Sequence, residues 1–179
     1  MANYRNSRFC ENLNIAQFET EGEYNIPVLQ PYEYEPCEFQ SVVLAFADRY
    51  GMDESFAAHI SGSFGGGIGR MRETCGSACG IFMLAGMEVK GDYPDPDLKK
   101  RNYEVVQRLA ADFRAQTGSV ICKELLGLNQ KRADGTIPEI QIVATPEART
   151  DEYYKKRPCI RMVETAIRVY CNYLEEEGL

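Results

Sequence analysis

The sequence predicts an all-α protein, a single-domain bundle of four to six helices with a glycine-rich loop before the central helix. Apolar residues recur at steps of three and four along several segments, as they do on the buried face of a helix. Proline, aspartate and glycine stand where such segments begin and end. The 179 residues are 44% hydrophobic and 26% charged, which is the composition of a folded globular domain.

Two regions of the chain differ in composition. Residues 1–35 are rich in Asn, Glu and Tyr and contain prolines that interrupt any helical period, so we expect an extended N-terminal arm. Residues 36–179 carry the helical patterns, and we expect them to form the four-cysteine helical domain. The tyrosines of the arm favour a homodimer as one use for this segment.

The first two helices of the domain have recognisable ends. A helix is expected over 36–51, because Pro36 suits the first helical position and Gly51 can end it. Asp53 then has the side chain of an N-cap, and it predicts a short helix over about 53–61.

Glycines dominate the segment that follows. Residues 62–69 form a loop that needs unusual backbone angles. A helix is expected over about 71–87, with small residues on one face that let another backbone approach closely. The segment 93–97 is predicted to be a turn and cap, and it starts a long amphipathic helix that Gly118 closes.

The last third of the chain predicts one short and one long helix. Residues 122–127 fit one to two helical turns, and 128–148 form a polar insertion with one strand-like stretch at 140–143. A final helix either begins at Pro158 or continues through it with a kink.

Composition excludes several classes of partner. The formal net charge is −7, so a nucleic acid backbone would be repelled, and we expect no nucleic acid partner. The longest apolar run, 81–85, is far shorter than the roughly 20 residues that span a bilayer, so we expect no membrane insertion. The N-terminus has no apolar signal segment, which favours a cytoplasmic protein.

Cysteine is the residue type that stands out. Seven cysteines, an odd number without a secretory signal, argue against a secreted disulfide framework. Four of them lie at or near expected helix N-termini: Cys37, Cys75, Cys122 and Cys159. Unpaired N–H groups and the positive end of the helix dipole favour a thiolate there, so we expect lowered pKa values. For each thiol alone, an inert buried side chain is the alternative.

The other three cysteines receive different predictions. Cys79 lies four residues after Cys75 on nearly the same helix face, where it flanks the site or packs the helix. Cys171 lies about 18 Å along the helix from Cys159, too far to share one small site, and is expected in the core. Cys10, in the arm, receives no role.

Several familiar motifs are absent from the sequence. There is no Cys-x-x-Cys pair, which argues against a thioredoxin-like dithiol and a zinc ribbon. The glycine loop lacks the Gly-Lys-Ser/Thr ending of a phosphate-binding loop. Its expected role is geometric: it packs tightly and delivers Cys75 to a helix start. A single histidine excludes multi-histidine metal sites.

The order of motifs resembles that of a known family. Cys37 is followed by the glycine run 65–69, by Glu-Thr-Cys-Gly-Ser-Ala-Cys-Gly at 73–80, by the segment 118–127 and by a late Cys159. This order is similar to that of the C_GCAxxG_C_C family of redox-active proteins, which has four cysteines around a Cys-Gly-Ala-x-x-Gly core. The resemblance covers about residues 36 to 175.

This chain departs from the family pattern in few places. Ser77 stands where the family has alanine, a small-for-small change. The arm before Pro36 and the insertion after Gly127 are additions.

The resemblance implies a redox-active protein that works with a redox partner protein or a transporter-associated component. It extends to part of the split-Soret cytochromes, where an iron–sulfur cluster accompanies the haems. By that likeness four cysteines would ligate a [2Fe–2S] cluster for electron transfer: Cys37, Cys75, Cys122 and Cys159. Three glycines are expected beside that cofactor: Gly66, Gly67 and Gly76.

Two other functions stay open at this point. The same four cysteines fit a thiol–disulfide redox protein without a metal. They also fit a structural or binding protein, with zinc or packed cysteines, that acts as a partner of a transporter or enzyme. No histidine-dependent triad and no paired-carboxylate arrangement is evident, so the sequence assigns no enzyme activity.

Overall fold

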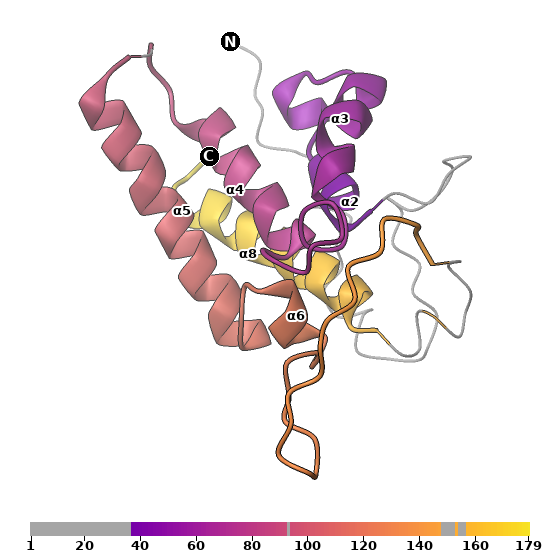
Figure 1. The fold of residues 1–179 in the computed structure, drawn as a ribbon. Helices are drawn as coiled ribbons and strands as arrows, with labels where there is room; N and C mark the ends of the chain where they lie inside the picture. Colours follow the sequence, from indigo (N-terminus) through magenta and orange to yellow (C-terminus); the bar gives the residue numbers. More distant parts are fainter. Residues whose placement is uncertain (1–36, 93, 148–152, 154–156) are drawn as a thin grey trace, which may run out of the picture.

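The computed structural model describes residues 37–92, 94–147, 153 and 157–179. Within them the chain forms six α-helices and no strand. They are α2 (Glu38–Ala45), α3 (Glu54–Ser61), α4 (Gly76–Glu88), α5 (Pro96–Thr117), α6 (Cys122–Leu125) and α8 (Cys159–Glu176) (Figure 1). The predicted all-α bundle of four to six helices is confirmed. The predicted N-terminal arm lies outside the described residues.

Several helix ends have the physical cause that the sequence predicted. The Asp53 side chain accepts a hydrogen bond of 2.9 Å from the backbone N–H of Phe56 and caps α3. The Asp95 side chain accepts one of 2.9 Å from the N–H of Asp97 and caps α5. Gly118 ends α5 with a left-handed φ of 90°, a conformation that glycine adopts without strain.

Other predicted boundaries were wrong. Helix α2 ends at Ala45, and a short 3-10 helix, η3 (Asp48–Tyr50), completes the segment that was predicted as one helix. Helix α4 begins at Gly76 rather than near 71, because the residues before it form turns and one isolated β-bridge. The strand-like residues 140–143 form a loop. The last helix begins after Pro158, so there is no kink there.

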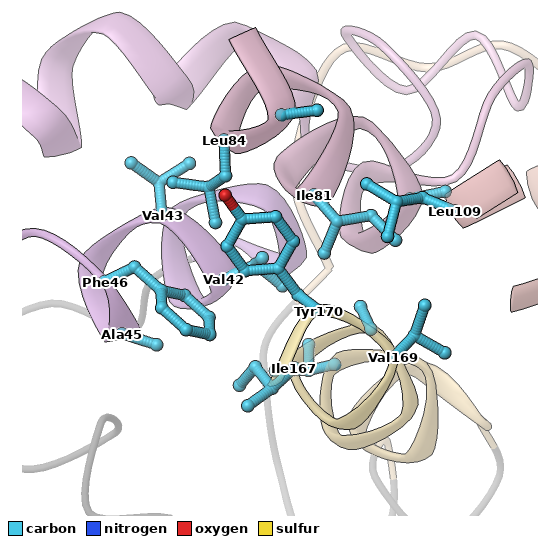
Figure 2. Close-up of a cluster of buried hydrophobic side chains, with 14 of the residues drawn as sticks. Val42, Val43, Ala45, Phe46, Ile81, Leu84, Leu109, Ile167, Val169 and Tyr170 are labelled. Carbon is cyan, nitrogen blue, oxygen red and sulfur yellow. The ribbon is translucent and has the colours of Figure 1, made fainter. Parts of the chain in front are cut away.

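Helix α4 lies at the centre of the bundle, where it contacts α2, α5 and α8. Figure 2 shows Tyr170 of α8 among the apolar side chains of α2 and α4. The centroids of its ring and of the Phe46 ring lie 4.9 Å apart, and the two rings are nearly perpendicular. The predicted small face of α4 packs on α2: a Cβ added at Gly80 would lie 2.7 Å from Cβ of Val42. Close helix contact at this point therefore requires glycine.

A chain of hydrogen bonds leads from the core to the edge of the bundle. The hydroxyl of Tyr170 lies 2.5 Å from that of Tyr50. Tyr50 in turn donates to a carboxylate oxygen of Glu88 at 2.7 Å, and Arg49 forms an ion pair of 2.7 Å with the same carboxylate. Each polar side chain in this series of hydrogen bonds thus has a partner, as burial requires.

Because Tyr50 lies in the middle of this chain, its hydroxyl should matter more than that of Tyr170. We expect Tyr50→Phe to lower the free energy of unfolding by about 1–3 kcal/mol, since the Tyr170 hydroxyl is then buried without a partner. Tyr170→Phe leaves the Tyr50–Glu88 bond intact and should cost about 1 kcal/mol. Urea unfolding followed by circular dichroism measures both values, and equal losses would contradict this explanation.

Among the described residues, none of the helices combines the length and the apolar character that crossing a bilayer requires.

Candidate thiol site

Four cysteines begin four different helices. Cys37 is the N-cap of α2, and Cys75 is the N-cap of α4. Cys122 and Cys159 are the first residues of α6 and α8. The predicted position of these cysteines at helix N-termini is therefore confirmed.

Three of these side chains meet at one small cavity. Cys75, Cys122 and Cys159 line it, and its volume of about 20 Å³ has room for one water-sized molecule. The other lining residues come from the segment 66–76, from the end of α6 and from the first turns of α2 and α8: Glu38, Gly66, Gly67, Arg72, Gly76, Leu125, Leu126, Pro158 and Met162. Segments that are far apart in the sequence thus bring three thiols together.

A short backbone pairing fixes two of the thiols side by side. Thr74 and Ile121 form an isolated antiparallel bridge. On either side of it, the N–H of Cys75 donates to the carbonyl of Val120 at 2.8 Å, and the N–H of Cys122 donates to that of Glu73 at 2.6 Å. Residues on the same face of such a pairing are near neighbours, so this bridge holds the two cysteines at one cavity.

The glycine loop fills the space between these helix starts. A Cβ added at Gly67, whose φ is 76°, would lie 2.6 Å from Cβ of Cys122. A Cβ added at Gly65 would lie 2.8 Å from Cβ of Cys37. Both approaches are closer than any side chain allows, so the loop can reach the two cysteines only because these residues are glycines.

The three glycines expected beside a cofactor do line the cavity: Gly66, Gly67 and Gly76. A Cβ added at Gly76 would lie 3.0 Å from the carbonyl oxygen of Phe64. A Cβ added at Gly66, whose φ is 62°, would lie 3.2 Å from Cα of Arg70. Close packing is therefore enough to require glycine at all three positions. A cofactor contact for them stays a prediction.

Cys37 lies at the edge of this group. It does not line the cavity, but the next residue, Glu38, does. Its backbone N–H donates to the side chain of Gln40 at 2.8 Å, and its sulfur lies 3.9 Å from the carbonyl oxygen of Ser61. Among the described residues, no group of three or more His, Cys, Asp or Glu side chains is arranged to hold a metal ion.

The predicted lowering of the thiol pKa was wrong for the three cavity cysteines. Burial raises the pKa of Cys75 to about 11, even though the backbone N–H groups of Ala78 and Ser77 act in the opposite direction. Burial also raises the pKa values of Cys122 and Cys159 above that of a free thiol. The loss of hydration at these buried positions outweighs the helix N-terminus.

Two charged residues of the cavity were missed by the sequence analysis. The negative charge of Glu38 adds to burial in raising the pKa values of the three cavity thiols, and its carboxylate accepts the N–H of Gly66 at 3.3 Å. Arg72 is only 7% exposed, and its positive charge lowers the pKa of the Cys122 thiol. The sequence contains one signal for them, which is proximity to a cysteine: Glu38 follows Cys37 directly, and Arg72 lies three residues before Cys75.

The insertion after Gly127 is tied to two segments of the site. Glu147 accepts hydrogen bonds of 2.7 and 2.9 Å from Arg157, just before α8, and lies 3.5 Å from a guanidinium nitrogen of Arg70 in the loop. Arg70 also donates to the carbonyl of Val143 at 2.7 Å. Because Glu147 is half exposed, these pairs contribute little stability, but they fix where the insertion lies.

The remaining described cysteines lie away from the cavity. Cys79 is a half-buried free thiol that does not line it, in agreement with a packing role. Cys171 is buried in the core, as expected, but it is disulfide-bonded rather than a thiol. Cys79 is thus a natural control for the cavity cysteines.

A family model spans most of the chain. The model described as "Putative redox-active protein (C_GCAxxG_C_C)" matches residues 37–173. The chain belongs to the C_GCAxxG_C_C family. The match begins at Cys37 and includes the three cavity cysteines, so the whole thiol site lies within the C_GCAxxG_C_C region. Comparison with curated proteins and with solved structures found no match.

Proposed function

We propose that this protein transfers electrons through a [2Fe–2S] cluster held by Cys37, Cys75, Cys122 and Cys159. The observation that carries the proposal is the meeting of three thiols, from three separate segments, at one cavity. Four cysteine thiolates are the usual ligands of such a cluster. Membership of a family described as redox-active supports the same reading.

The chemistry of the cavity fits a positively charged metal centre. Each of the three thiols would become an anion as a ligand, and they share the cavity with the carboxylate of Glu38. Cys75 and Cys122 both raise the pKa of Cys159, after burial and Glu38. The positive charge of a bound metal centre would compensate this repulsion, and the thiols that coordinate it would lose their protons.

The chain's own groups would orient and tune such ligands. A bound cluster would supply a one-electron couple. The backbone N–H groups of Ser77 and Ala78 lower the pKa of the Cys75 thiol, and N–H groups beside ligand sulfurs adjust the potential of a centre. The donor atoms of the cavity suit a cluster, but its volume has room for only one water-sized molecule. Binding would therefore require the lining side chains to move apart.

A second candidate is favoured by that small volume. Two of the three adjacent thiols could form an S–S bond and give up two protons and two electrons. The disulfide of a partner protein would accept them and become a dithiol. This function needs no space for a cofactor. Either function requires a redox partner or transporter-associated component and suits the reducing cytoplasm.

Anaerobic purification of the full chain tests the proposal. We expect brown protein with iron and acid-labile sulfide in equal amounts, about two of each per chain, and a visible spectrum that bleaches on reduction. Colourless protein whose free thiol count changes by about two with the applied potential would favour the dithiol function. Zinc without any redox change would select a structural binding protein and overturn both.

A further inference from the structure

Within the described part of the chain, one buried cation at the thiol cavity forms no ion pair with a carboxylate. Arg72 is only 7% exposed and lines the cavity. The ion pairs of the described residues join other cations to carboxylates, and none of them includes Arg72. Arg72 instead shares the cavity with Cys122, and its positive charge lowers the pKa of that thiol. A buried cation is costly unless a negative charge compensates it.

The backbone at this residue is also unusual. Arg72 has a φ of 65°, in the left-handed region where most side chains are strained. Its N–H donates to the carbonyl of Gly66 at 3.3 Å, and its carbonyl accepts the N–H of Lys123 at 3.1 Å. These bonds hold Arg72 between the glycine loop and α6. A glycine would adopt this φ without strain, so the backbone alone does not explain an arginine at this position.

We propose that Arg72 is the charge-compensating residue that raises the redox potential of the thiol site. This inference rests on the cluster form of the proposed function. Reduction of a cluster would add an electron, and so negative charge, beside the sulfur of Cys122. A fixed positive charge beside that sulfur stabilises the reduced form and therefore makes the potential more positive.

Glu38 lines the same cavity with the opposite charge. Its negative charge raises the pKa of Cys75, Cys122 and Cys159, so it opposes the addition of further negative charge. Removing the charge of Glu38 should therefore shift the potential in the opposite direction from removing that of Arg72. Two residues of one cavity thus predict shifts of opposite sign, which a purely structural role would not produce.

Redox titration of the full chain tests this inference. Arg72→Gly removes the charge and suits the backbone, Arg72→Gln removes the charge and keeps most of the side chain, and Arg72→Lys keeps the charge. Both neutral variants should lower the equilibrium constant for reduction at least about tenfold, which is about 59 mV for a one-electron couple. Arg72→Lys should stay close to the parent protein, and Glu38→Gln should move to higher potential.

The outcomes separate this inference from the proposed function. If the parent protein has a redox couple but neither folded neutral Arg72 variant moves it, Arg72 does not set the potential and the proposed function stands. A shift of the same sign in Arg72→Gln and Glu38→Gln would also overturn the inference. If the parent protein has no redox couple at all, both proposals are wrong.

Discussion

Replacing Cys122 with serine should abolish the redox site, whereas replacing Cys79 with serine should leave it intact. Cys122 lines the cavity with Cys75, Cys159 and Arg72, and it is only 7% exposed. Serine has nearly the same size but no sulfur, and it is not a thiolate ligand. We expect anaerobically purified Cys122→Ser to contain at least about tenfold less iron than the parent protein.

Cys79 makes this comparison specific. It lies only four residues from Cys75, on the same helix, and is a half-buried free thiol outside the cavity. Burial raises its pKa to about 11, as for Cys75, so its intrinsic reactivity is a close match to that of a cavity thiol. Cys79→Ser should keep the iron, sulfide and visible spectrum of the parent protein. Equal losses in the two variants would mean that the cavity has no special role.

A stability measurement on Cys122→Ser distinguishes the loss of a metal ligand from a loss of the fold. The backbone N–H of Cys122 still bonds to Glu73 in the serine variant, because that bond does not involve the side chain. We therefore expect Cys122→Ser to remain folded, with a loss of stability below about 2 kcal/mol. If the protein instead has the dithiol function and Cys122 is one of the two thiols that form the S–S bond, the same variant should lose the potential-dependent change in thiol count.

The positions of the cysteines on the fold could be predicted because their signals are local. Pro158 is the N-cap of α8 and so places Cys159 at the first position of that helix. Cys37 likewise caps the helix that was predicted from Pro36. Gly118, with its left-handed φ, ends α5 and leaves a short segment before Cys122. Each of these features depends on a few neighbouring residues, which a sequence displays directly.

The pKa values and the charged residues of the site depend on contacts between distant segments. Cys75 lies at a helix N-terminus as predicted, yet burial by other segments raises its pKa. The start of α4 was misplaced because Thr74 pairs with Ile121, a residue 47 positions later. Arg72 is buried only because its backbone takes a left-handed φ between the loop and α6. No local pattern predicts these features, since each requires the folded chain.

Among glycine-to-alanine substitutions in the glycine loop, Gly67→Ala should lower the stability of the protein most. Its Cβ would lie 2.6 Å from Cβ of Cys122 and 2.9 Å from both Cα of Arg72 and the backbone nitrogen of Glu73. Two of these three atoms belong to the backbone, so no side-chain rotation can relieve the overlap. We expect a loss of about 2–5 kcal/mol, the sum of a left-handed alanine and an overpacked contact.

Gly69→Ala is the matched control for this variant. Gly69 lies in the same loop and has a φ of 55°, but its added Cβ would come no closer than 3.9 Å to the carbonyl oxygen of Ser63. This variant should therefore show only the strain of a left-handed alanine, about 1–2 kcal/mol. Urea unfolding of both variants isolates the effect of the close approach to Cys122.

The two variants should differ in redox chemistry as well as in stability. In Gly67→Ala the loop can relieve the overlap only by moving away from Cys122, and Gly66, Arg72 and the cavity move with it. Iron content or the redox-dependent thiol count should then fall in Gly67→Ala and persist in Gly69→Ala. Equal stability and equal redox behaviour of the two variants would show that the loop need not lie against the Cys122 side chain, and would remove the packing argument for a single thiol site.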